Sequence, residues 1–310
     1  MKRRTILSAF LALPFGTRLL ADCEVKGTKP VAVTYTTVKP GMHSLYVLGD
    51  FGTGGSLQKK VARAMNDRAA RFGMPLAMIS TGDNIYPGGV ESATDAQWQT
   101  KFERIYALEN LQNKKWVAVL GNHDYRGSVN AQIEYGKINK QWIMPSTYFV
   151  QPCPNAETML TLFCLDTQAI LKKSTGWKEQ IQWLEHEVQQ CKSRWKVVVG
   201  HHPLRSYGHY QDQVWLLDLI KPILDDNDVA AYLCGHDHDL QVIQNPNDKF
   251  TCIVSGSGGG CRSTTWGAHS KIAGTGGGFA VLQFDKSSMF AQVIMADGTE
   301  IGTVAVGSSK

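Results

Sequence analysis

The chain has 310 residues, of which 43% are hydrophobic and 19% are charged, and its 32 Lys and Arg against 27 Asp and Glu give a formal net charge of +5. This composition excludes a disordered chain, and the length is sufficient to bury a large core. Four of the basic residues lie within residues 1–21, which contain no acid, so the rest of the chain is nearly neutral. A basic surface for nucleic acid is therefore not predicted, and no nucleic-acid partner is expected.

The first segment, residues 1–21, has the pattern of a secretory signal peptide. A basic start precedes an apolar run from Ile6 to Phe15 that is too short to span a bilayer, and Ala21 is a plausible cleavage point. A buried N-terminal helix and a membrane anchor are the alternatives. We expect export to a secreted or periplasmic location, by the Sec route rather than the twin-arginine route that Arg3-Arg4 faintly resembles. No stable membrane anchor is expected after cleavage.

The mature part, residues 22–310, is expected to form a single domain. Apolar runs rich in Val, Leu and Ile predict strands at 45–48, 76–80, 116–120, 159–165, 196–199 and 230–233. Helical spacing predicts helices at 56–72, 95–107, 130–141, 177–192 and 212–226. After Cys234 the chain changes to strands separated by Gly-rich turns and ends in an alternating pattern over residues 279–305. This order predicts an α/β half that leads into a β-rich half.

Seven cysteines follow the predicted cleavage point, so at least one of them lacks a partner within the chain. None forms a C-x-x-C pair, which argues against a thiolate zinc site or a redox pair. Export favours disulfides, and the pairs nearest in sequence are Cys153/Cys164 and Cys252/Cys261. The spacing alone does not determine the connectivity.

Five of the predicted strands are followed by a small polar cluster that begins with glycine. In open α/β sheets, ligands bind outside the carboxyl ends of the strands, so these clusters are expected to converge at one sheet edge. The glycine in each cluster allows a sharp turn and a close approach of the backbone. The clusters are Gly49-Asp50, Gly82-Asp83, Gly121-Asn122-His123, Gly200-His201 and Gly235-His236.

The side chains delivered by these clusters and their neighbours form a metal-ligand set. Carboxylate, imidazole, amide and phenolate groups suit iron, manganese or zinc. Two cations form the clamp used in phosphoryl transfer, and a carboxylate between them can bridge both. Taken singly, each Asp could equally cap a helix, and a lone His is more often a satisfied polar residue, but the joint pattern favours metal. The residues are Asp50, Asp83, Tyr86, Asn122, His123, His201, His236 and His238.

In this order, the five clusters resemble the five motif blocks of the calcineurin-like metallophosphoesterases. Tyr86 lies three residues after the second Asp, and a Tyr at this position resembles the pattern of the purple acid phosphatases. Residues 121–135 and 231–240 are similar to the small tartrate-resistant type of that family. The resemblance covers residues 44–300 approximately. It implies a mixed α/β fold, a four-layer α-β-β-α sandwich in which helices flank two mixed sheets and the active site lies at the carboxyl ends of the strands.

The resemblance also implies a binuclear metal centre. A ferric ion would be held by Asp50, Tyr86 and His238, and its tyrosinate bond gives the family its purple colour. A divalent iron, zinc or manganese ion would be held by Asn122, His201 and His236. Asp83 would bridge the two ions. Hard phenolate and carboxylate ligands favour a trivalent ion, although the same ligands could hold two manganese or zinc ions.

The function implied by the resemblance is that of an exported acid phosphatase. It would hydrolyse phosphate monoesters with a hydroxide made acidic by the metals. His123 resembles the residue that binds phosphate and helps to protonate the leaving group. His209 resembles a second such residue, although its spacing from His201 differs slightly from the mammalian pattern. Asn122 and His202 are candidate substrate contacts, and His202 stands where the family often has Tyr.

The expected substrates are small phosphomonoesters, with nucleotides and phosphoproteins as candidates. One alternative is a phosphodiesterase or nucleotide hydrolase on the same scaffold. Another is a non-catalytic binding or anchoring relative, but the full set of ligands and His123 argues against it. Residues 166–180 are shorter than the protease-sensitive loop of the mammalian enzymes, so activation by proteolysis is not expected.

Overall fold

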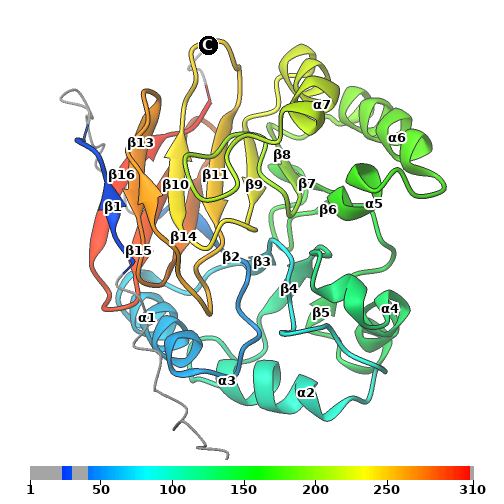
Figure 1. The fold of residues 1–310 in the computed structure, drawn as a ribbon, viewed down its shortest axis with the longest axis vertical. Coiled ribbons are helices and arrows are strands. Elements are labelled where there is room, and N and C mark those ends of the chain that lie inside the picture. Colours follow the sequence, from blue (N-terminus) through cyan, green and yellow to red (C-terminus); the bar gives the residue numbers. More distant parts are fainter. Residues whose placement is uncertain (1–22, 30–40, 308–310) are drawn as a thin grey trace, which may run out of the picture.

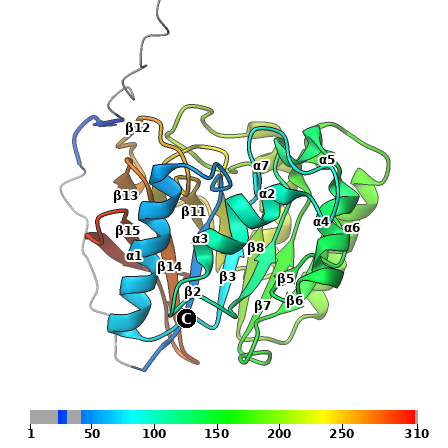
Figure 2. The same ribbon diagram turned by 90° about the horizontal axis from the view of Figure 1, so that it is seen from below.

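The computed structural model describes residues 23–29 and 41–307, so the predicted signal segment lies outside the described residues. Two seven-stranded mixed sheets pack face to face, and helices cover the outer side of each (Figures 1 and 2). The main hydrophobic cluster combines buried side chains of both sheets, among them Val47 and Val281 from one and Val197 and Leu233 from the other. The mixed α/β sandwich expected from the sequence is therefore confirmed.

The first sheet has the strand order β16-β15-β14-β2-β3-β4-β5. Strands β2 to β5 run parallel, and the C-terminal strands β14, β15 and β16 extend the sheet in antiparallel fashion. The alternation over residues 279–305 corresponds to these last three strands. The bounds are β2 His43–Leu48, β3 Ala77–Ser80, β4 Lys115–Ala118, β5 Trp142–Ile143, β14 Gly278–Phe284, β15 Met289–Met295 and β16 Glu300–Ala305.

The second sheet has the strand order β13-β10-β11-β9-β8-β7-β6. Its centre, β11-β9-β8-β7, is parallel, and β13, β10 and β6 pair in antiparallel fashion at its two sides. The bounds are β6 Phe149–Pro152, β7 Leu160–Cys164, β8 Trp195–Val199, β9 Ala231–Cys234, β10 Leu240–Ile243, β11 Thr251–Ser255 and β13 Ser270–Gly274. All six strands predicted in the first three quarters of the chain are present across the two sheets.

The helices follow the predicted apolar spacing. Helix α1 (Ser56–Phe72) buries Val61, Met65 and Ala69, which lie four residues apart on one face. The predicted helix at 95–107 is interrupted, because a π-helical segment (Gln99–Glu103) separates α2 (Ala96–Trp98) from α3 (Arg104–Tyr106). The remaining helices are α4 Val129–Ile138, α5 Thr167–Leu171, α6 Trp177–Gln190 and α7 Val214–Asp226. Within the described ranges, no helix combines the length and apolar character needed to cross a membrane.

The cysteine pairs nearest in sequence do not form disulfides, so that prediction was wrong. The structure contains a disulfide between Cys23 and Cys261, and the other five cysteines are free. Strand register separates Cys153 from Cys164, because Cys164 pairs with Phe149 at the opposite end of β6. Cys252 is buried within β11, whereas Cys261 lies in the loop that follows.

The disulfide joins the N-terminal segment to that loop. Next to it, β1 (Val25–Lys26) pairs in parallel with β12 (Thr264–Thr265) as a separate two-stranded sheet. The N-terminal segment thus lies against residues 261–265, close to the carboxyl ends of the central strands.

Candidate metal centre

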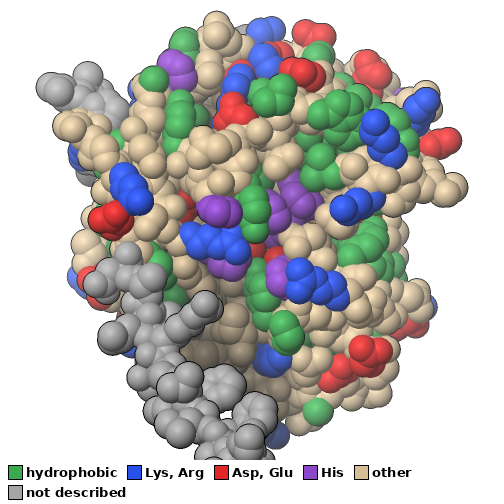
Figure 3. Space-filling view, in the orientation of Figure 1, with side chains coloured by type: hydrophobic (Ala, Val, Ile, Leu, Met, Phe, Trp, Pro, Cys, Tyr) green, Lys and Arg blue, Asp and Glu red, His purple; other side chains and the backbone are tan. Residues whose placement is uncertain are grey.

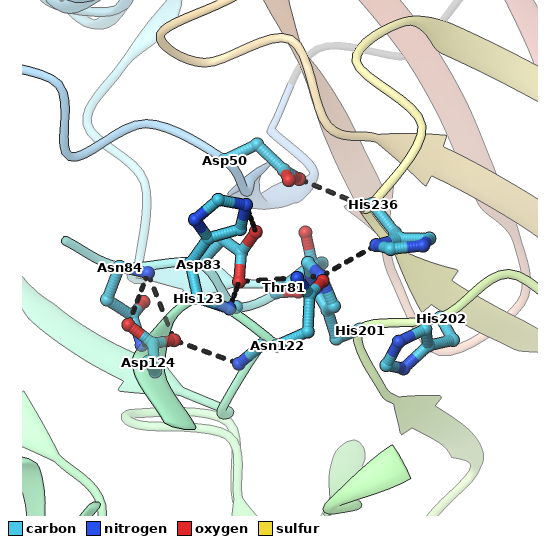
Figure 4. Close-up of polar contacts among 12 residues, drawn as sticks. Asp50, Thr81, Asp83, Asn84, Asn122, His123, Asp124, His201, His202 and His236 are labelled. Atoms are coloured by element: carbon cyan, nitrogen blue, oxygen red, sulfur yellow. Dashed lines mark hydrogen bonds and ion pairs between the residues drawn. The ribbon is translucent and has the colours of Figure 1, made fainter. Parts of the chain in front are cut away.

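The five polar clusters converge, but from two sheets rather than one. Asp50, Asp83 and Asn122 follow β2, β3 and β4 of the first sheet, whereas His201 and His236 follow β8 and β9 of the second. The expectation of a single sheet edge was therefore wrong. The clusters still meet, because the face-to-face packing of the sheets brings the carboxyl ends of their central strands together (Figure 4).

The backbone turns sharply at three of the convergent residues. Asp50, Asp83 and His236 have φ angles of 56°, 52° and 67°, in the left-handed region that non-glycine residues seldom occupy. Such a conformation costs free energy of order 1–3 kcal/mol and clusters at functional sites. Here it turns each side chain from the end of its strand toward the others.

Two of the strand-end glycines are required by close approach. A Cβ atom on Gly121 would lie 2.2 Å from Oδ1 of Asp83, and one on Gly235 would lie 2.4 Å from Oδ2 of Asp50. Each glycine therefore leaves room for a carboxylate delivered by another strand. The close approach of the backbone expected from the sequence is confirmed at these positions.

A first group of candidate ligands surrounds the Tyr86 hydroxyl. Its Oη lies 2.9 Å from Oδ1 of Asp50, 2.8 Å from Oδ2 of Asp83 and 3.1 Å from Nε2 of His238. Nε2 of His238 is also 3.3 Å from Oδ1 of Asp50. These oxygen and nitrogen atoms face a common point, as the ligands of one cation would.

This first group carries negative charge, and the ion-pair partners of its carboxylates among the described residues are histidines. Asp50 and Asp83 are at most 1% exposed, and no Lys or Arg of the described residues forms an ion pair with either. Burial, together with the charges of the two carboxylates, raises the pKa of Tyr86 far above its usual range. Buried carboxylates require a compensating positive charge, so the residues present fit a bound cation.

A second group surrounds His201. Its Nδ1 lies 2.9 Å from the carbonyl oxygen of Thr81, and because a carbonyl only accepts, Nδ1 must donate. Nε2 is then directed at Oδ1 of Asn122 (3.1 Å), Nδ1 of His236 (3.2 Å) and Oδ1 of Asp83 (3.6 Å). A ring N–H held by a backbone carbonyl is the usual arrangement of a metal-binding imidazole.

The pKa shifts in the second group show where positive charge is favoured. Burial lowers the pKa of His201, but the charges of Asp83 and Asp50 outweigh it and leave that pKa raised. Burial, reinforced by the charge of His201, lowers the pKa of His236 far below its usual range. His236 is therefore a neutral imidazole, the form that binds a metal.

Asp83 belongs to both groups. Oδ2 of Asp83 lies at the Tyr86 hydroxyl, whereas Oδ1 faces His201 and accepts a hydrogen bond of 2.7 Å from the backbone N–H of His123. The two oxygens of one buried carboxylate thus point toward two sets of ligands. This is the arrangement that a bridging carboxylate requires.

The three predicted substrate-contact histidines occupy different positions. His123 Nδ1 lies 2.7 Å from the carbonyl oxygen of Pro87, and its Nε2 is 4.0 Å from Oδ2 of Asp83. His202 is buried, and one of its ring nitrogens lies within 4.8 Å of those of His201 and His236. His209 is exposed and makes a ring contact with Tyr210 at 4.8 Å. On the face of the molecule shown in Figure 3, histidine side chains gather at the centre, with Lys and Arg side chains beside them.

Two acidic residues that the sequence did not assign support the centre. Asp124 is fully buried and accepts backbone hydrogen bonds from Asn84 (3.0 Å) and Gly121 (2.8 Å), which ties the turn after β3 to the turn after β4. Burial, followed by the charge of Asp83, raises the pKa of Asp124 to about 7. Asp237 accepts from Ser206 Oγ and from the backbone N–H of Tyr210 and so fixes the loop that carries His209. Each of them directly follows one of the predicted polar clusters, and that position was the signal that could have identified them.

The chain is similar to a known family and to named proteins. A model of the calcineurin-like phosphoesterase family matches residues 43–240. The chain is 35% identical to purple acid phosphatase 17 of Arabidopsis thaliana over 234 residues, 70% of this chain and 69% of that protein. It is 30% identical to tartrate-resistant acid phosphatase type 5 of Sus scrofa over 273 residues, 78% of this chain and 77% of that protein.

Solved structures share the fold. GAP50, described as the anchor in the inner membrane complex of Plasmodium, matches with a TM-score of 0.77 at 22% identity over 87% of this chain and 90% of its own. The purple acid phosphatase PPD1 from yellow lupin seeds matches with a TM-score of 0.62 at 14% identity over 86% of this chain and 54% of its own. At these identities, the likeness establishes the architecture alone.

Proposed function

The chain belongs to the calcineurin-like phosphoesterase family and, within it, to the purple acid phosphatases, and we propose that it hydrolyses phosphate monoesters at a ferric and a divalent ion held by the convergent strand-end residues. It is an enzyme, a metal-dependent phosphoric monoester hydrolase. The observation that carries the proposal is the Asp83 carboxylate, whose two oxygens face two separate sets of ligand atoms.

The two groups of ligands differ in chemistry, and this difference assigns one ion to each group. In the proposal, the ferric ion is held by Asp50, Tyr86 and His238, and the divalent ion by Asn122, His201 and His236, with Asp83 shared. The first set contains a phenol and a carboxylate, which are hard and anionic, whereas the second contains neutral amide and imidazole groups. When bound, two cations supply charge stabilisation to the phosphoryl oxygens and make water at the site more acidic.

His123 supplies the proton to the leaving group in this proposal. Its Nδ1 must donate to the carbonyl of Pro87, because that oxygen only accepts. The ring is thereby oriented with Nε2 on the side of Asp83, and it is partly exposed (22%). A protonated Nε2 can hydrogen-bond a phosphoryl oxygen and then donate to the departing alkoxide.

The Tyr86→Phe variant tests the ferric assignment. Wild-type protein should absorb visible light through its tyrosinate–ferric bond, and the variant should lose this band because the phenolate oxygen is removed. Tyr148→Phe, the same change at a residue that packs on Trp183, should retain the band. An active wild-type enzyme that is colourless and free of iron would refute the ferric ion.

The His123→Ala variant tests the leaving-group role. Turnover of an alkyl phosphate should fall by about 100-fold or more, the usual contribution of a general acid, while the fall for 4-nitrophenyl phosphate should be smaller because its leaving group needs less protonation. Metal content should stay close to wild type. His186→Ala, an exposed change on α6, is the control. Equal losses for both substrates would contradict the role.

We also propose that the chain is exported with loss of residues 1–21. The Cys23–Cys261 disulfide supports this, because disulfides persist mainly in oxidising compartments. Fractionation of cells that produce the intact chain should recover it from the periplasm or the medium, and mass spectrometry should show the shortened N-terminus. Retention of the uncleaved chain inside the cell would contradict export.

A further inference from the structure

A pocket of about 510 Å³ lies beside the candidate metal centre. Its walls are the loop that carries His209, the residues around the disulfide and the N-terminal strand β1. Lys26, His209 and Arg262 are among its lining residues, and none of the described lining residues is Asp or Glu. A concave site of this size with basic groups and no acid favours an anionic ligand.

Arg262 links this pocket to the metal centre. Its guanidinium lies over the ring of Tyr210, 5.0 Å from the ring centroid. The same Tyr210 ring is stacked on the imidazole of His236, with centroids 4.0 Å apart and planes 21° apart. The backbone N–H of Arg262 donates to the carbonyl oxygen of His238 at 2.8 Å. Arg262 therefore contacts one candidate ligand, His238, through its backbone and reaches a second, His236, through the ring of Tyr210.

The guanidinium of Arg262 has a nitrogen that is not hydrogen-bonded within the described residues. Nη1 of Arg262 is buried and finds no hydrogen-bond partner among the described residues. Arg205, in contrast, is paired with Asp212 and Asp248 at 2.9 Å each. The buried acid Asp237 accepts from Ser206 and from the backbone of Tyr210, and the Arg262 charge acts on it without a close ion pair among the described residues. Because Nη1 itself is out of reach of solvent, a ligand would meet Arg262 from the pocket that the residue lines, where an anionic group is the strongest partner of a guanidinium.

The chain holds Arg262 in place from both sides. The residue before it, Cys261, is bonded to Cys23, and β12, which begins two residues after it, pairs with β1. The hydroxyl of Thr275 donates to the carbonyl oxygen of Arg262 at 2.5 Å. Because these contacts fix its backbone before any ligand arrives, binding to Arg262 would cost little ordering entropy.

We propose that Arg262 and this pocket bind a second anionic group of the substrate, a phosphate or carboxylate carried by the leaving group, while the ester phosphate lies at the metal centre. The inference rests on the proposed function and deepens it by naming a substrate class. Arg262 is the specificity-determining residue. Lys26 is ion-paired with Glu24 at the exposed rim, at 3.5 Å, and contributes less to binding.

Three substrates with the same three-carbon leaving group test the proposal: propyl phosphate, propane-1,3-diol bisphosphate and 3-(phosphonooxy)propanoate. Wild-type kcat/KM should be at least about tenfold higher for the bisphosphate than for propyl phosphate, the ratio given by one charge-assisted hydrogen bond of about 1.4 kcal/mol. Arg262→Gln should abolish this preference while changing kcat/KM for propyl phosphate by less than about threefold. If Arg262→Gln lowers kcat/KM for the bisphosphate alone, the subsite binds phosphate. If it lowers kcat/KM for both the bisphosphate and the carboxylate substrate, the subsite binds either anion.

Two further variants control for charge and folding. Arg104→Gln removes an equal charge from an exposed residue outside the pocket, and should leave the substrate preference unchanged. Arg262→Lys keeps the charge and should retain part of the preference. It also serves as the test if Arg262→Gln does not fold. No preference in the wild type, a preference that survives in Arg262→Gln, or a preference that is undiminished in Arg262→Lys would each overturn the proposal.

Binding of a non-hydrolysable probe separates this inference from the proposed function. Titration calorimetry of the holoenzyme with propane-1,3-bisphosphonate should give a Kd at least about tenfold weaker in Arg262→Gln than in wild type, with no such change for propylphosphonate. If none of the three esters is hydrolysed, the proposed function fails, and the titration still tests the pocket. Equal affinities in wild type and variant would overturn the inference even in an active phosphatase.

Discussion

Two buried carboxylates, to which no Lys or Arg of residues 23–29 and 41–307 is paired, are the constraint on which the rest of this structure depends. Asp50 and Asp83 lie where the carboxyl ends of two sheets meet, next to a phenol whose pKa they and its burial raise far above the usual range. Such a cluster is unfavourable unless positive charge enters it. The left-handed backbone at both residues means that the fold also accepts local strain to direct their side chains there.

The shared carboxylate connects the two halves of the fold. Asp83 is delivered by the first sheet, yet one of its oxygens faces His201, which the second sheet delivers. Gly121 leaves space for it, and Asp124 ties its turn to the neighbouring turn with backbone hydrogen bonds. The packing of one sheet on the other therefore sets the separation of the two ligand groups. A shift between the sheets would alter the site even if every ligand remained.

The sequence was most informative where structure is local. Each glycine-polar cluster follows an apolar run, so the strand ends and their side chains could be predicted together. Contacts between segments that are distant in the sequence could not be predicted in this way. Nothing local shows that His201 and Asp83 belong to different sheets, that Cys23 pairs with Cys261 238 residues away, or that Arg262 contacts Tyr210. The π-helical segment was missed because its residues keep ordinary helical spacing. Asp124 directly follows the cluster Gly121-Asn122-His123, but its role depends on a turn 40 residues earlier.

The number of metal ions bound per chain, in wild type and in Asp83→Ala, tests the shared carboxylate most directly. Elemental analysis of purified protein should find two ions per wild-type chain. Because Asp83 contributes an oxygen to both groups, the variant should lose both ions together, whereas Asn122→Ala should lose mainly the divalent one. A variant at Asp83 that keeps one ion at full occupancy, or a wild-type chain that binds only one, would contradict the account.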